Sequence, residues 1–216
     1  MFINIVTPTF DTYLDLLDTA NSIIEIKKVR QDLSICWIII DNMSTDHTQD
    51  ILHTDKYKKI VDIMVVEQDN GIYDAMNKGL NLCRNGHVLF LGVGDKIIQL
   101  PKEIDHDTVY YGTTIVDNSR YYKSTIHNYI FNKFNTLHHQ SMLTPIKFHS
   151  KFSLEYSTCS DYAHNLEMLI TGRRFQFDEN LLAYHKPGGR SSNLDQVKEE
   201  CKTIQKKFLD MIKSEL

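Results

Sequence analysis

Two consecutive stretches decide the fold of this 216-residue chain: Asp69-Asn70-Gly71-Ile72-Tyr73-Asp74-Ala75-Met76-Asn77-Lys78-Gly79 and His87-Val88-Leu89-Phe90-Leu91-Gly92-Val93-Gly94-Asp95. The first stretch passes from a polar loop into a helix, whose apolar residues from Ile72 to Cys83 fall on one stripe. The second is an apolar run that ends in a glycine-containing turn with one carboxylate. Together they predict a loop, a helix and a buried strand with Asp95 at its end.

The preceding residues repeat this strand and helix alternation. Apolar runs predict strands at 2–6, 35–40 and 60–67, and helical spacing predicts a helix at 13–29. Pro8 lacks a backbone donor, so we expect the first strand to end at Thr7-Pro8-Thr9. The unbroken run at 35–40 is typical of a parallel strand covered on both faces. The first 95 residues therefore predict parallel βαβ units.

The expected carboxyl ends of these strands share a chemical character. All are polar or contain glycine: Thr7-Pro8-Thr9, Asp41-Asn42, Glu67 to Gly71, and Gly92 to Asp95. Ligands of such sheets bind beyond the carboxyl ends of the strands. The sequence therefore predicts one binding site at this edge, and it also predicts that Ser44 or Thr45 caps the helix after the second strand.

The residues after Asp95 follow a different pattern. They predict short strands at 109–112, 120–122, 176–177 and 181–184 and helices at 161–171 and 194–212. The last helix carries an apolar stripe, formed by Leu194, Val197, Cys201, Ile204, Phe208 and Met211. The length suits one domain over 1–216.

Composition excludes several classes of protein. The net charge of −4 gives no electrostatic support for nucleic-acid binding. The four cysteines are scattered without a CxxC pair, which favours reduced thiols over a disulfide scaffold or a zinc site. The N-terminus reads as a strand and not as a signal peptide, and no apolar run reaches membrane-spanning length. We therefore expect a cytoplasmic protein.

Several motifs together resemble a known family. Besides 69–79, they are Val6 to Phe10, Ile40 to Thr48, His138-His139-Gln140-Ser141, Ser160-Asp161-Tyr162 and Gly188-Gly189-Arg190-Ser191. This set is similar to the inverting glycosyltransferases of family 2, which have the α/β GT-A nucleotide-diphospho-sugar fold with a mainly parallel, Rossmann-like sheet and a mixed C-terminal half. The resemblance is strongest to bacterial transferases of polysaccharide, O-antigen and colanic-acid biosynthesis, and it covers nearly the whole chain. It implies a nucleotide-sugar-binding half at 1–98 and an acceptor-binding, catalytic half at 99–216.

The resemblance implies a set of residues that bind the nucleotide-sugar: Thr7, Pro8, Thr9, Asp41, Asp69, Gly71, Tyr73, Lys78, His139 and Arg190. A carboxylate such as Asp41 can accept a hydrogen bond from a uracil-type N–H, or it can cap the next helix instead. The amides at a helix N-terminus near Gly71 favour anions. The alternative for Asp69 is that it is only an N-cap, and Lys78 can contact a phosphate or pair with Asp74.

Two further residues are implied as metal ligands. Mn²⁺ or Mg²⁺ prefers carboxylate oxygen as a ligand and neutralises the charge of a diphosphate leaving group. We therefore expect Asp95 to be a ligand of this ion and His185 to be a second one. The family usually carries more carboxylates in this turn than the one present here, so a plain turn residue is the alternative. His185 precedes a basic loop that can fold over a diphosphate.

Asp161 is the expected catalytic base. Inverting transfer needs a carboxylate that takes the proton of the acceptor hydroxyl, and Asp161 begins a predicted helix at the family's position for this base. A carboxylate at a helix N-terminus also stabilises the helix, which is the alternative role.

The expected function is metal-dependent transfer of a sugar, with inversion, from a nucleotide-diphosphate donor, a UDP-sugar in our reading. The acceptor is a saccharide or a lipid-linked glycan of surface polysaccharide biosynthesis. The lysines of the last helix can contact the inner face of the cytoplasmic membrane peripherally, or they form an ordinary solvated surface. The rivals are a degenerate, non-catalytic nucleotide-sugar-binding protein and a sugar-phosphate nucleotidyltransferase. The latter is disfavoured because residues 7–12 lack its glycine-rich basic loop.

Overall fold

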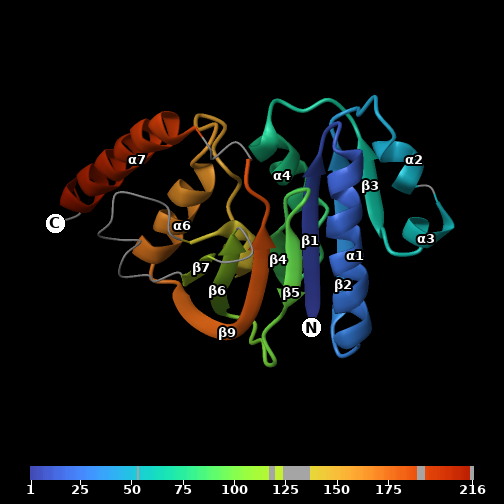
Figure 1. The fold of residues 1–216 in the computed structure, drawn as a ribbon. Coiled ribbons are helices and arrows are strands. Elements are labelled where there is room, and N and C mark those ends of the chain that lie inside the picture. The colour runs from blue at the N-terminus through green and yellow to red at the C-terminus, as the bar shows by residue number, and fades with distance from the viewer. Residues whose placement is uncertain (53, 117–119, 124–136, 189–192, 215–216) are drawn as a thin grey trace.

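The computed structural model describes residues 1–52, 54–116, 120–123, 137–188 and 193–214 (Figure 1). Its N-terminal part is a parallel sheet in the order β3-β2-β1-β4. The strands are β1 (Phe2–Thr9), β2 (Ser34–Asp41), β3 (Ile63–Val66) and β4 (His87–Phe90). The expected parallel βαβ arrangement is confirmed.

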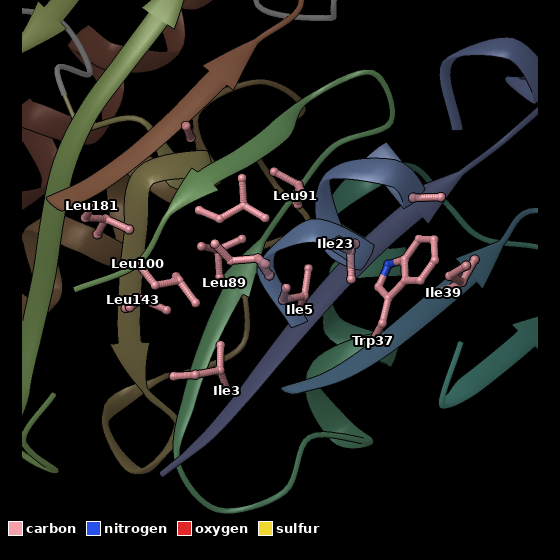
Figure 2. Close-up of a cluster of buried hydrophobic side chains, with 14 of the residues drawn as sticks. Ile3, Ile5, Ile23, Trp37, Ile39, Leu89, Leu91, Leu100, Leu143 and Leu181 are labelled. Atoms are coloured by element: carbon pink, nitrogen blue, oxygen red, sulfur yellow. The ribbon is translucent and has the colours of Figure 1, made fainter. Parts of the chain in front are cut away.

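Helices cover both faces of this sheet. On one face, α1 (Tyr13–Val29) packs against β1, β2 and β4 through a cluster that includes the fully buried Trp37 (Figure 2). On the other face, α4 (Ile72–Asn81) packs against side chains of alternate parity on the same strands. The short helices α2 (Thr48–Leu52) and α3 (Asp55–Lys58) lead from β2 to β3. The alternating burial explains why these strands are apolar throughout.

The first strand is longer than expected, because β1 continues through Pro8 to Thr9. The Val6 carbonyl accepts from Leu91 N on the β4 side, and the Thr9 carbonyl accepts from Asn42 N on the β2 side. Pro8 shares the parity of Val6, so its nitrogen faces the β4 side, where β4 has already ended at Phe90. The missing donor therefore breaks no ladder hydrogen bond, and the expected strand at 2–6 was too short by three residues.

The second half extends the sheet in the order β4-β8-β6-β9-β5, and β7 pairs with residues 113–116 of β6. The pairs are antiparallel except for β6 with β9. The elements are β5 (Lys96–Gln99), β6 (Thr108–Val116), β7 (Arg120–Lys123), β8 (Met142–Pro145) and β9 (Arg174–His185), with 3₁₀ turns η1 (His139–Ser141) and η2 (Ile146–Phe148) on either side of β8.

One strand replaces two expected ones in this half. The predicted strands at 176–177 and 181–184 are parts of the single strand β9, whose register to β6 shifts between Tyr111 and Thr113. Gly112 lies at that shift, and a Cβ there would sit 1.9 Å from the Leu181 carbonyl oxygen. Because the pairing is irregular here, a period-two pattern in the sequence does not show that the strand is continuous.

The last two helices, α6 (Ser160–Ile170) and α7 (Leu194–Ser214), pack together at the far end of the sheet (Figure 1). Val197, Cys201, Ile204 and Phe208 contribute to this contact. Leu194 and Met211 are 64% and 46% exposed, so the expected apolar stripe is shorter than predicted. Within the described ranges, none of the helices is both long and apolar enough to cross a membrane.

Candidate active site

The carboxylate of Asp41 is fully buried at the end of β2 and is occupied by its own turn. It accepts from the Ser44 amide (3.0 Å), the Ser44 hydroxyl (2.5 Å) and Gln49 Nε2 (2.9 Å). The helix cap itself comes from Asp46, whose carboxylate accepts from Thr48 N at 2.8 Å, so the expected cap by Ser44 or Thr45 was wrong. Asp41 therefore shapes the turn at the sheet edge.

The end of β1 divides its side chains between the two faces of the sheet. The Thr7 hydroxyl is buried on the α1 face and accepts from Trp37 Nε1 at 3.0 Å. Thr9 is 5% exposed and its hydroxyl contacts that of Thr12 at 2.8 Å. Pro8 is half-buried at the same edge as Asp41, opposite Ile40. Thr7 can thus reach a ligand only through its backbone.

The loop before α4 is tied to the end of β2. Asp69 N donates to Asn42 Oδ1 (2.8 Å), and the Asp69 carboxylate accepts from Gly71 N (2.9 Å). Gly71 precedes α4 with φ 109°, a conformation that favours glycine. Lys78 donates to the Gln68 carbonyl at 2.5 Å and lies 3.2 Å from Glu67 and 3.6 Å from Asp74. Both alternatives for Lys78 stay open, because its ammonium borders the loop while it pairs with Asp74.

Asp95 and His185 meet although 90 residues separate them. Asp95 is 4% exposed, and its Oδ1 accepts from Lys186 N at 2.8 Å and lies 2.9 Å from His185 Nδ1. The Thr19 hydroxyl donates to the Asp95 carbonyl at 2.9 Å, which fixes the turn after β4. The end of β9 therefore delivers an imidazole to the one carboxylate of this turn.

A second pair forms around Asp161, the second residue of α6. Asp161 is 7% exposed; its Oδ1 accepts from the Tyr73 hydroxyl at 2.9 Å, and its Oδ2 lies 3.5 Å from His139 Nδ1. Burial and the nearby Asp161 charge raise the pKa of Tyr73 well above 10, so its hydroxyl stays protonated and donates. Tyr73 on helix α4, in the first half of the chain, thus holds the Asp161 carboxylate of the second half.

The turn η1 joins the two pairs through consecutive residues. His139 contacts Asp161, and Gln140 Nε2 lies 2.8 Å from His185 Nδ1. Gln140 Oε1 is buried, and no hydrogen-bond partner for it exists within the part of the chain described here. Rotating the amide by 180° would place Oε1 at the imidazole, where it accepts from Nδ1–H together with Asp95. Asp95, His185, His139 and Asp161 therefore belong to one site.

The histidines of this site differ in their tendency to carry charge. Burial lowers the pKa of His139, but the hydrogen bond and the negative charge of Asp161 outweigh it and raise the net pKa above 6.5. Burial, with the neighbouring His185 and His139, lowers the pKa of His138 to about 4. The protonated form of His139 is favoured beside Asp161, whereas His138 stays neutral near pH 7.

Some functional candidates were missed from the sequence, and one lies outside the structure. Arg190 falls outside the described residues. Asp161 lines a cavity together with His149 and His164, whose rings lie 3.9 Å apart between centroids and are tilted by 30°. Burial lowers the pKa of His149 to about 4, so both rings pack as neutral groups. No sequence pattern marks this pair of rings, since only the fold brings the η2 segment to α6.

Comparisons with known proteins find similarity to glycosyltransferases. Residues 4–93 match the family described as Glycosyl transferase family 2. A Bacillus subtilis (strain 168) protein named as a candidate teichuronic acid biosynthesis glycosyltransferase, TuaG, is 30% identical over 97 residues, which are 44% of this chain and 36% of TuaG. The structure of S. aureus TarS 1-349 with UDP-GlcNAc has a TM-score of 0.68 at 18% identity, covering 89% of this chain and 61% of that one.

A further solved structure shares the fold. The mannosyltransferase PcManGT from Pyrobaculum calidifontis, in complex with GDP-Man and Mn²⁺, has a TM-score of 0.63 at 12% identity, covering 87% of this chain and 57% of that one. These likenesses confirm the expected GT-A fold. The chain spans about a third of TuaG and about three fifths of the TarS chain.

Proposed function

Because residues 4–93 match glycosyl transferase family 2, we propose that the chain transfers a sugar, with inversion, from a UDP-sugar to a glycan or lipid-linked acceptor of surface polysaccharide biosynthesis. The observation that carries the proposal is the turn η1, whose consecutive residues His139 and Gln140 touch the Asp161 pair and the Asp95 pair. A base and a charge-neutralising centre at one sheet edge are what glycosyl transfer requires. The UDP-GlcNAc complex of TarS supports the donor class.

In the proposed reaction, Asp161 takes the proton of an acceptor hydroxyl while that oxygen bonds to the anomeric carbon of the donor sugar. The bond from the anomeric carbon to the phosphate oxygen breaks, and UDP leaves from the opposite face. The Tyr73 hydrogen bond at 2.9 Å holds one carboxylate oxygen in place, and Oδ2 beside His139 remains to accept the proton. The product is a β-linked glycan if the donor is α-linked.

The Asp95 and His185 side chains fit a divalent cation such as Mn²⁺ or Mg²⁺. Asp95 Oδ1 and His185 Nδ1 lie 2.9 Å apart at the end of β4, so one such ion could contact both side chains. Within the described residues no three His, Cys, Asp or Glu side chains converge as a cage, so the diphosphate and water would supply the remaining ligands. When bound, the ion would neutralise the charge of the leaving diphosphate.

The nucleotide is proposed to bind along the edge formed by Thr7 to Thr9, Asp41 and the loop from Asp69 to Gly71. Asp41 is committed to Ser44 and Gln49, so we assign it the role of holding the turn against which the base lies. Thr7 contributes backbone only, while Lys78 lies close enough to the loop to turn toward a phosphate. His139 and Arg190 complete the proposed donor contacts.

The second candidate function is binding without transfer. The single carboxylate in the turn at 92–95 favours it, because a weak metal site would leave nucleotide binding without efficient departure of UDP. Release of free UDP from a donor in the presence of an acceptor mixture separates the two functions: turnover supports the transferase, and binding without turnover supports the degenerate protein.

A thermal-shift panel with UDP, GDP, dTDP and CMP, each with and without Mn²⁺, tests the proposal. We expect UDP with Mn²⁺ to raise the melting temperature most, since a ligand at about 100 times its Kd stabilises by about 2.7 kcal/mol. In Asp95→Ala the Mn²⁺-dependent part of the shift should disappear, while the exposed-site control Asp107→Ala should keep it. Equal shifts with and without Mn²⁺ in the wild-type protein would contradict the metal assignment.

A further inference from the structure

The N-terminus of α6, which presents Asp161, has no side-chain cap of its own. Its N-cap residue is Cys159, whose side chain makes no capping hydrogen bond, although its carbonyl accepts from Ala163 N at 3.1 Å. The amides before and within the first turn of a helix need acceptors from elsewhere. A buried helix start that carries a functional carboxylate therefore depends on an acceptor supplied by another element.

Glu200 of α7 supplies that acceptor through both carboxylate oxygens. Oε2 accepts from the amides of Thr158 and Cys159 at 2.9 Å and from the Thr158 hydroxyl at 2.9 Å. Oε1 accepts from the amide and the hydroxyl of Ser157, at 3.1 and 2.8 Å. Three consecutive residues, ending two positions before Asp161, are thus held by one side chain that lies 41 to 43 residues away in the sequence.

The surroundings of Glu200 keep it in this position. Partial burial raises the pKa of its carboxyl, but the hydrogen bonds from Thr158 and Ser157 outweigh it and lower the net pKa, so the carboxylate is ionised near neutral pH. Next to it, Cys201 Sγ lies 3.5 Å from Cys159 Sγ, and Gln205 Nε2 donates to the Tyr162 hydroxyl at 2.8 Å. A negative charge at a helix N-terminus is also favoured by the helix dipole.

We propose that Glu200 is a positioning residue for the base Asp161: it fixes the segment 157–159 and thereby the direction in which the Asp161 carboxylate points. This inference rests on the proposed function, since it assumes that Asp161 takes the proton. Because a reacting group displaced by about 1 Å can cost about 100-fold in rate, the loss of Glu200 should reduce turnover much more than donor binding.

The matched pair Glu200→Gln and Glu199→Gln tests this role. Glutamine keeps the size of the side chain but places an NH₂ group against backbone donors, whereas Glu199 is exposed and pairs only with Lys202 among the contacts described for its side chain. We expect Glu200→Gln to lower kcat about 10- to 100-fold, with the donor KM within about twofold, and Glu199→Gln to change neither. Thr158→Val, which removes one of the five hydrogen bonds that segment 157–159 donates to Glu200, should lower kcat less and in the same direction.

Hydrogen exchange of the peptide covering 157–161 provides a readout that needs no ligand. We expect deuterium uptake to be at least about 10-fold faster in Glu200→Gln and unchanged in Glu199→Gln, because only the first variant frees the amides. Faster exchange with wild-type kcat would overturn the positioning role, as would a rise in donor KM equal to the fall in kcat. If Asp161→Asn keeps full activity, the proposed base fails instead, while the exchange result still reports on the Glu200 contacts.

Discussion

The carboxylates of Asp41 and Asp69 differ from those of Asp161 and Asp95 in where their partners lie along the chain. Asp41 is held by Ser44, three residues away, and Asp69 by Gly71, two residues away, both within the first half. Asp161 is held by Tyr73 over 88 residues, and Asp95 meets His185 over 90, so both of these contacts join the two halves. The edge at Asp41 and Asp69 is thus held by contacts within the first half, whereas the Asp161 and Asp95 pairs form only when both halves of the sheet are in place.

The edge proposed to bind the donor is therefore separate from the residues proposed to act as base and metal ligands. Local turns at the ends of β1 and β2 form a rigid edge that does not depend on the second half for its hydrogen bonds. The proposed base and metal ligands instead depend on β8 and β9, which bring η1 and His185 to the end of β4. Substitutions in the contacts that join the two halves should therefore affect turnover, whereas those in contacts within the first half should affect stability.

The largest effect is expected for Asp161→Asn. A general base contributes about 10² to 10⁴ in rate, and the amide cannot take the acceptor proton, so kcat should fall by about 10³-fold or more. UDP binding, measured by calorimetry, should stay within about twofold of wild type because the donor edge lies in the first half. The exposed carboxylate Asp195 gives the control Asp195→Asn, which should leave both unchanged. Wild-type turnover in Asp161→Asn would exclude it as the base.

A smaller effect is expected for Tyr73→Phe, which removes the contact that crosses between the halves. A hydrogen bond to a charged group contributes about 1.5 to 3 kcal/mol, so kcat should fall roughly 10-fold and the free energy of unfolding should fall by about 1.5 kcal/mol. Tyr57→Phe is the control, because the Tyr57 hydroxyl contacts only Lys56 within the described contacts and lies on α3. If kcat is unchanged while stability falls, α4 supports the fold and not the base.

Much of the fold could be predicted from the sequence where contacts are local or periodic. The helix at 13–29 has the expected bounds, and the strand and helix alternation predicts the parallel sheet. The failures have physical causes. Pro8 stays in β1 because a neighbouring strand ends before it, and β9 is continuous because Gly112 admits a register shift. Both causes lie in the partner strand, which a single-sequence pattern does not contain.

The residues of the site could likewise be identified from the sequence in part, whereas their contacts could not. The resemblance identifies Asp161 and Asp95, and the position of His185 before a basic loop makes it a candidate ligand. The structure brings Asp95 to His185 and His139 to Asp161. The roles of these residues stay predictions. Nothing in the spacing of α7 distinguishes Glu200 from Glu199, since neighbouring glutamates on an amphipathic helix look alike until the packing of α7 on α6 is known. The contacts between elements that are distant in the chain therefore could not be predicted from the sequence.

The smallest effect, confined to stability, is expected for Thr7→Val in the first half. The change keeps the shape of the side chain but removes the acceptor of the buried Trp37 N–H, which should lower the free energy of unfolding by about 1 to 3 kcal/mol. UDP binding and kcat should not change, because the Thr7 side chain faces α1 and not the sheet edge. The exposed Thr203→Val is the control for the same chemical change. Denaturant unfolding followed by Trp37 fluorescence measures the loss, and weaker UDP binding at unchanged stability would show that the Thr7 hydroxyl, and not only its backbone, belongs to the donor site.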